Sequence, residues 1–257
     1  IMNKFFTLEV KPTIAASKQA LGAFADGDVL ADWFAFDIPN GGNLLRDAYL
    51  ITKPNNSFRQ THAVEAHFAK TINGFAPNTI GTVHGTASGS VAAYQNHLIW
   101  YMHTEEDPDT STTLDNVTIQ RFMMQYALYK QVIPGPNFVF QGEPDTGATK
   151  GFSRLYVALT AIDGDVNFVS TVQVDGNQTK GTPSLTVKTT QARSNFGLGD
   201  ELVDEDGVRI GTITGSNSAI TATNIPLGGP GGLLNDMTNN KDVYTTTPMR
   251  LILSFER

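Results

Sequence analysis

The residues of this sequence that could bind a metal ion are histidines and carboxylates at close spacing, and His62, Glu65 and His67 form the best such cluster. Imidazole and carboxylate groups are common zinc ligands, but the ligands of one ion must converge on a single point. The cluster lies in a stretch of strand-forming residues, and side chains alternate between the two faces of a strand. His62 would then face one side while Glu65 and His67 face the other, so a metal site would require a β-bulge. We therefore predict a solvated or hydrogen-bonded face here.

The other three of the five histidines offer no better ligand set. His97 and His103 fall on opposite faces of the strand predicted for residues 97–104, which favours a structural role for both. His84 lies between Val83 and Gly85 and is predicted to be a loop residue.

Two acidic stretches could attract a cation. The run Asp204-Glu205-Asp206-Gly207 is similar to the start of a calcium loop, but an EF-hand needs glycine at its sixth position and glutamate at its twelfth. Here glycine comes fourth and the twelfth position is Gly215, so we predict a turn. Residues 105–109 are predicted to be a solvated acidic loop.

No pattern for phosphate binding or nucleophilic catalysis is complete. The glycine-rich residues 228–232 are not followed by the lysine and hydroxyl residue of a P-loop, and residues 85–90 lack the spacing of a nucleophile elbow. Composition leaves a Ser/His/Asp triad open, but nothing selects one. We predict no catalytic, cofactor-binding or metal-binding residues, and a protein that is not an enzyme.

Composition indicates the class of fold and narrows the partners. Only 17% of the residues are charged, with 24 glycines and 12 prolines, which is typical of a β-rich fold with many turns. The formal charge of -7 and the scattered lysines and arginines argue against binding to nucleic acid or an anionic membrane. No apolar run has the length of a membrane span, and without cysteine there are no disulfides.

We expect the chain to be organised around two apolar runs, residues 151–168 and residues 249–255. Most positions of both runs are apolar, so both faces of each predicted strand are apolar, as in strands that are covered on two sides. We expect them to lie in one sheet, with the polar, glycine-rich segment between them inserted. Further strands are predicted for residues 4–10, 29–38, 44–52, 61–70, 97–104 and 138–141.

Two segments are less regular. Residues 13–28 are predicted to be a loop, because Ser17, Gly22 and the turn at residues 26–28 oppose a helix. Residues 116–132 are predicted to begin as a strand, and the later part fits a helix as well as a strand.

The inserted segment is predicted to be a small SH3-like β-barrel. Its strands are expected at residues 184–189, 199–203, 208–214 and 219–225, with a hairpin at Asp206-Gly207. Residues 227–247 are predicted to be a flexible return to the last strand. So small a core is marginal alone, so the module should lean on the main domain or a neighbouring chain.

The predicted fold is therefore all-β: a jelly-roll-like β-sandwich with an inserted small SH3-like β module. The sandwich comprises residues 2–168 together with 245–257, and the module with its return linker comprises residues 169–244. Short strands separated by clusters of glycine, proline, asparagine and aspartate are typical of such folds.

Several patches of the sequence resemble virion structural proteins of marine tailed bacteriophages, either capsid decoration or tail accessory proteins. These patches are residues 33–39, 68–74, 142–145, 155–158 and 253–257. The stretch of residues 196–213 is similar to small β modules of phage capsid and tail accessory proteins. The resemblance transfers no catalytic residue. It implies a homo-oligomeric protein on the virion surface, bound to the major capsid protein or to other virion proteins.

The leading hypothesis is a capsid decoration or cement protein, and the structural alternative is a tail or receptor-binding fibre component. An alternative of another class is a carbohydrate-binding module that uses Trp33, Trp100 and Tyr101 as a stacking platform. These aromatic residues lie in apolar strands, which favours core packing. A glycan depolymerase is the enzymatic alternative.

Overall fold

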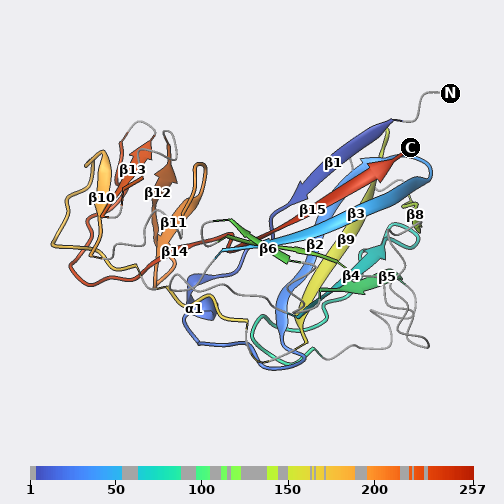
Figure 1. The fold of residues 1–257 in the computed structure, drawn as a ribbon, viewed down its shortest axis with the longest axis horizontal. Coiled ribbons are helices and arrows are strands. Elements are labelled where there is room, and N and C mark those ends of the chain that lie inside the picture. The colour runs from blue at the N-terminus through green and yellow to red at the C-terminus, as the bar shows by residue number, and fades with distance from the viewer. Residues whose placement is uncertain are drawn as a thin grey trace.

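The computed structural model describes residues 4–53, 63–87, 97–104, 111–114, 117–122, 138–143, 150–162, 164, 166–170, 172–188, 196–214, 220–221, 223–228 and 231–257. These ranges form antiparallel sheets and one short helix, so the all-β fold is confirmed. Figure 1 shows a large body on one side of the molecule and a smaller one, containing β10 to β14, on the other.

The large body has a six-stranded sheet that contains both ends of the chain. Its strands lie in the order β1 (Phe5–Val10), β15 (Met249–Glu256), β3 (Asn43–Thr52), β7 (Val117–Arg121) and β6 (Ser111–Leu114), and β8 (Phe138–Phe140) also pairs with β3. Every pairing is antiparallel.

A four-stranded sheet forms the other layer of the large body. Its strands lie in the order β2 (Val29–Pro39), β9 (Phe152–Ala161), β4 (Val64–Lys70) and β5 (Leu98–His103). Alternate residues of both sheets meet in one buried core, which includes Leu155 and Val157 of β9 and Leu251, Leu253 and Phe255 of β15. The large body is therefore a β-sandwich; jelly-roll connectivity stays a prediction.

The expectation that residues 155–162 and 249–255 share a sheet is wrong. β9 pairs with β2 and β4, whereas β15 pairs with β1 and β3. The two strands face each other across one core instead. An apolar strand has the same pattern in either layer of a sandwich, so its sequence does not say which layer it joins.

The small body is a five-stranded sheet with a core of its own. The order is β10 (Ser184–Thr186), β13 (Asn224–Gly228), β12 (Arg209–Ile213), β11 (Glu201–Asp204) and β14 (Val243–Thr245). Residues 172–175 connect the two outer strands, because Val174 bridges to Val187 beside β10 and Gln173 bridges to Asp242 beside β14. The ladder thus closes into a small barrel around a separate apolar cluster.

The barrel corrects two details of the sequence interpretation. The last predicted strand, residues 219–225, is displaced to β13. Residues 227–247 are not a flexible return: they contain β14 and bury Leu233, Met237 and Val243. Backbone hydrogen bonds hold this segment, including Leu233 N–H to the Thr182 carbonyl at 2.8 Å. The hairpin at Asp206-Gly207 is confirmed, with Gly207 at φ 78°.

Two further elements differ from the predictions. Residues 13–28 contain the one-turn helix α1 (Ala16–Gln19), which a loop prediction missed. The structure also contains strand β6, which begins at Ser111, shortly after the predicted acidic loop, where no strand was predicted. Residues 116–132 begin as a strand, as expected, but the alternative helix lies outside the described residues.

Candidate functional site

The outer face of the six-stranded sheet is a regular surface built from paired strands. Leu251, Leu253 and Phe255 of β15 point into the core, so the residues between them point outward. Cross-strand pairing aligns these outward residues in rows. One row runs Phe5, Glu256, Leu44, Val139; another runs Glu9, Ile252, Tyr49, Arg121; a third runs Arg250, Ile51, Ile119. We call these three rows, with Lys11, Arg46 and Asp47, the outer face.

The charges of the outer face are paired with one another across strands. Arg250 Nη1 lies 3.1 Å from Glu9 Oε1, and Lys11 Nζ lies 3.1 Å from the other oxygen of the same carboxylate. Arg121 Nε lies 2.8 Å from Asp47 Oδ1, and Arg46 pairs with Glu256. The surface is therefore electrostatically satisfied before any partner arrives.

Two pKa shifts reflect this pairing. Burial raises the pKa of Glu9, but hydrogen bonds from Lys11 and Arg250 outweigh it and leave that pKa lowered. The Tyr49 hydroxyl donates to Asp47 Oδ2 at 2.7 Å, and this hydrogen bond, with burial, raises the pKa of the phenol.

Apolar side chains lie between and beside these ion pairs. Leu44, Tyr49, Ile51, Ile119 and Ile252 are each partly exposed. At the two ends of the first row, Phe5 is 71% exposed and Val139 is 58% exposed. An open sheet face with apolar area and compensated charge is suited to contact with another protein surface.

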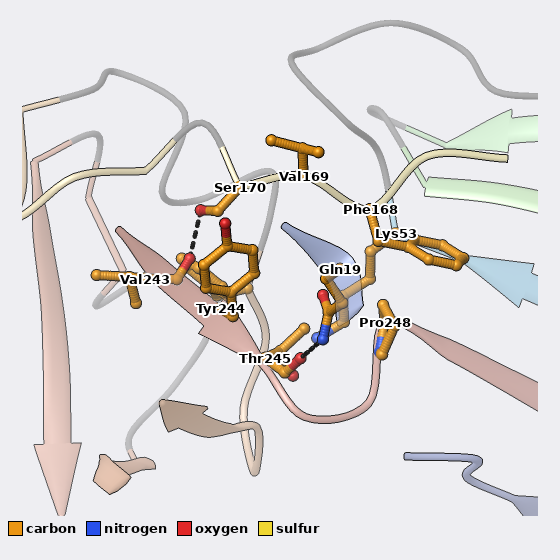
Figure 2. A pocket seen from close by; sticks show the side chains of 10 residues that line it. Gln19, Lys53, Phe168, Val169, Ser170, Val243, Tyr244, Thr245 and Pro248 are labelled. Carbon is orange, nitrogen blue, oxygen red and sulfur yellow. Dashed lines mark hydrogen bonds between the residues drawn. The ribbon is translucent and has the colours of Figure 1, made fainter. Parts of the chain in front are cut away.

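A second candidate is the cavity at the junction of the sandwich and the barrel, seen in Figure 2. It has a volume of about 340 Å³ including its mouth, and Gln19, Lys53, Ser170, Tyr244 and Thr245 are among the residues that line it. Its enclosed part has room for about two water molecules. The cavity is thus small for an organic ligand. Two of its polar residues, Lys53 and Gln19, instead make contacts between the sandwich and the barrel.

Lys53 and Asp200 join the two bodies by a partly buried ion pair. Lys53 follows β3 of the sandwich and Asp200 precedes β11 of the barrel, and both side chains are nearly covered. Burial lowers the pKa of Lys53, while the Asp200 carboxylate opposes that change and the cations Arg250 and Lys11 add to it. Asp200 Oδ2 also accepts the Gly197 N–H at 2.7 Å.

Gln19 joins the same two bodies by hydrogen bonds. Its side chain is 1% exposed, and its Nε2 donates to the carbonyls of Ile14 at 2.7 Å and Thr245 at 2.8 Å. The second of these bonds is drawn in Figure 2. A small apolar cluster of Ala16, Val203 and Tyr244 lies at the same junction. These contacts fix the barrel on the sandwich. We call the Lys53–Asp200 ion pair, the Gln19 hydrogen bonds and this apolar cluster the joint.

The structure brings together Glu65 and His67 of the predicted histidine and carboxylate cluster, on one face of β4. His67 is buried, and its Nε2 lies 3.1 Å from Thr160 Oγ1 and 3.3 Å from Glu65 Oε2. Burial lowers the pKa of His67 to about 4, and burial raises the pKa of Glu65. Of the two predicted environments, His67 therefore has the hydrogen-bonded one and not the solvated one. His62 lies outside the described residues.

The other histidines have structural contacts where they are described. His97 Nδ1 lies 2.9 Å from the Lys70 carbonyl oxygen. His84 is a loop residue with φ 63°, and its ring lies 4.4 Å from that of Phe24. The side chain of His103 lies outside the described part of the chain. Within that part, no three histidine or acidic residues gather as metal ligands.

The proposed carbohydrate platform is described only at Trp33. Its indole Nε1 donates to the Asn78 carbonyl at 2.7 Å, and the ring packs against the buried cluster of Val29, Ile80 and Ala158. The side chains of Trp100 and Tyr101 lie outside the described residues.

Of the remaining motifs, the run of residues 204–207 is a turn. Asp204 Oδ1 accepts the N–H groups of Asp206 at 3.0 Å and Val208 at 2.7 Å, so this carboxylate organises the hairpin. The acidic residues 105–109 lie outside the described ranges, as do parts of residues 85–90 and 228–232. The one helix described, α1, is too short to cross a membrane.

The fold and the site together define an all-β protein in which a sandwich carries a barrel, joined to it by an ion pair, hydrogen bonds and a small apolar cluster. Comparison with known proteins adds no family to this description: no family model matches the chain, and no curated protein matches its sequence.

Sequence reasoning predicted that the module leans on the main domain or a neighbouring chain, but it missed the residues of the joint and the whole of the outer face. The rows of the outer face depend on which strands pair, which local patterns do not encode. Gln19 follows Ser17 and Lys18, and Lys53 stands between the apolar end of a strand and Pro54; no spacing rule marks either residue as a contact between the two bodies. The alternation of apolar and other residues in 4–10 and 249–255 could have predicted that each of these strands has one face in the core and one face outside it.

Proposed function

We propose that the protein is a non-enzymatic structural protein of a tailed bacteriophage virion, which binds the capsid surface as a decoration or cement protein. The resemblance given above supplies the class of particle. The observation that carries the proposal is the outer face of the six-stranded sheet, where cross-strand ion pairs surround partly exposed apolar side chains.

Such a face lowers the energetic penalty of being covered. An isolated charge loses its hydration when a partner covers it, whereas a charge that is already paired loses less. Burial of apolar area contributes roughly 25 cal/mol per Å², and repetition over a symmetric lattice multiplies weak contacts. The acidic net charge of -7 favours solubility of free copies before assembly.

The joint gives this proposal a geometric consequence. Because Lys53–Asp200 and Gln19 fix the barrel on the sandwich, docking of the sandwich also fixes the direction in which the barrel projects. Figure 1 shows the barrel beyond one end of the sandwich. The barrel would then be presented in one orientation at every site on the particle.

Electron microscopy tests the proposal on particles of a phage that encodes the chain. A gold-labelled antibody against the protein should decorate the capsid of intact virions. Label on the tail would support the tail or fibre alternative, and absence of the protein from purified particles would contradict both.

Re-binding to particles stripped of the protein tests the surface itself. Ile252→Glu places an uncompensated carboxylate between Glu9 and Tyr49 and should reduce binding at least tenfold. Phe75→Glu is the matched control, because Phe75 is 73% exposed on a turn away from the outer face and should leave binding unchanged. Equal binding by both variants would refute the outer face as the docking surface.

A further inference from the structure

The free edge of β1 carries backbone groups that no described residue satisfies. β1 is the first strand of the six-stranded sheet and pairs with β15 on one side. Lys4 and Arg257 exchange both of their backbone hydrogen bonds, at 3.3 and 2.9 Å. Since these bonds alternate along an antiparallel strand, the N–H and C=O groups of Phe5, Thr7 and Glu9 point away from β15. Among the residues that the structure describes, none bonds to them.

The core side of the same strand is incompletely covered. Phe6 and Leu8 pack against the sandwich core, and the Phe6 ring stacks on Phe255 with centroids 5.3 Å apart. Both side chains nevertheless remain partly exposed, whereas Val10 on the same side is 5% exposed. This partial exposure is expected of a strand that has no outer neighbour among the strands the structure describes.

An exposed edge of this kind is a template for pairing with another strand. Natural proteins protect such edges with proline, with bulges or with inward-pointing charges. β1 has none of these between Phe5 and Val10, and its pairing with β15 shows no register shift. No described residue pairs with this edge, so it can accept a partner strand.

We propose that this partner is β1 of a second copy of the chain, paired antiparallel across a two-fold axis at Thr7. Phe5 then pairs with Glu9 of the second copy, and Thr7 pairs with its own counterpart. On the core side, Phe6 lies beside Leu8 of the second copy, and Leu8 lies beside its Phe6. The strand is thus self-complementary: apolar residues meet twice, and no like charges stand opposite each other.

This arrangement satisfies the free backbone groups and joins two sheets into one. The pairs centred on Phe5, Thr7 and Glu9 provide about six inter-chain hydrogen bonds, two for each pair. The two outer faces become parts of one continuous surface, which would give a docked dimer two contacts instead of one. The inference concerns the free protein and stands whether or not that protein binds a virion.

The mass of the full chain in solution is the first test. Sedimentation of a concentration series should show a species of twice the 27.8 kDa chain mass. Thr7→Pro removes an N–H that points to the free edge and not to β15, so it should abolish the dimer while the internal ladder persists. Thr7→Val keeps the N–H and the strand preference and should dimerise like the wild type.

Disulfide trapping provides a second test that does not depend on how well the proline variant folds. The chain has no cysteine, so an introduced one is unique. At the two-fold axis the two copies of residue 7 have Cα atoms about 5.5 Å apart, within the range of a disulfide. The two copies of Phe5 would lie about 14 Å apart along the strands, which is too far.

Thr7→Cys should therefore cross-link on oxidation, and Phe5→Cys should not. A wild type that remains monomeric over the whole series would overturn the proposal. So would a dimer that survives Thr7→Pro, or equal cross-linking by both cysteine variants. Because only the purified chain is used, these outcomes are independent of capsid binding.

Discussion

The ion pair between Lys53 and Asp200 predicts how strongly the sandwich and the barrel are coupled. The two side chains are only 12% and 13% exposed. Asp200→Asn keeps an oxygen for the Gly197 N–H but leaves the Lys53 ammonium nearly buried without its counter-ion. Arg250 and Lys11 are close enough to repel that ammonium.

The expected loss follows from the cost of an unpaired buried charge, which is about 3–5 kcal/mol for a fully buried pair. Because about an eighth of each side chain remains exposed, we expect Asp200→Asn to lower the free energy of unfolding by about 3 kcal/mol. Lys53→Met also breaks the pair but leaves Asp200 bonded to Gly197, so its loss should be smaller. The double variant removes both charges and should recover most of the loss, which a double-mutant cycle would report as coupling.

The two tryptophans allow the coupling to be assigned to the junction. Trp33 and Trp100 belong to sandwich strands, so tryptophan fluorescence reports the sandwich, whereas far-ultraviolet circular dichroism reports both bodies. In urea, the two signals should coincide for the wild type and separate for Asp200→Asn, with the barrel unfolding first.

Glu201→Gln is the control for this experiment. It breaks the neighbouring Glu201–Arg209 ion pair, whose side chains are 44% and 53% exposed, and should change stability by less than about 0.5 kcal/mol. If Asp200→Asn were no more destabilising than this control, the joint would not depend on the ion pair and the reasoning would be refuted.

Two further predictions concern the barrel and the sandwich core. In the barrel, a Cβ added at Gly232 (φ 57°) would lie 2.2 Å from the Thr182 carbonyl oxygen. Gly232→Ala should therefore lower the free energy of barrel unfolding, measured by circular dichroism in urea, by about 1–3 kcal/mol more than Gly176→Ala, where φ is 69° but no atom lies within 4 Å. In the sandwich, the folded-state pKa of His67 is about 4 against 6.5 unfolded, so the unfolded chain binds more protons between these values and stability should fall by up to about 3 kcal/mol as pH drops through that window. Urea midpoints from pH 7 to pH 4 should show this slope in the wild type and in His97→Gln, and much less of it in His67→Gln; an unchanged slope in His67→Gln would assign the acid sensitivity to other groups.

Local patterns predicted the strands well but not their partners. The apolar alternation of residues 151–168 and 249–255 identified β9 and β15, and Asp206-Gly207 identified the β11–β12 hairpin. The assignment of β9 and β15 to one sheet failed because pairing depends on residues distant in sequence, such as Tyr156 with Ala69 and Ile252 with Tyr49.

The barrel shows why glycine-rich composition is a poor guide to flexibility. Residues 227–247 contain many glycine and asparagine residues, which favour loops when read alone. In the fold they run beside residues 178–182, with Met237 and Gln178 exchanging two backbone hydrogen bonds at 2.9 and 2.8 Å. The segment is ordered by tertiary hydrogen bonds and by the burial of Leu233 and Met237, neither of which local propensity reports.

The joint lies close to the C-terminal end of β1, whose free edge borders the sandwich. β1 leads through Ile14 into α1, and Ile14 N–H donates to the Thr246 carbonyl at 2.9 Å, so the chain after β1 contacts the segment that follows β14. An antiparallel pair of β1 strands places this end of each copy at opposite ends of the joined sheet. The barrels of the proposed dimer would then project at its two far ends, held there by Lys53–Asp200 and Gln19. A continuous outer face between two fixed barrels suits an elongated element laid along a protein surface, and it follows from strand pairing rather than from any catalytic group.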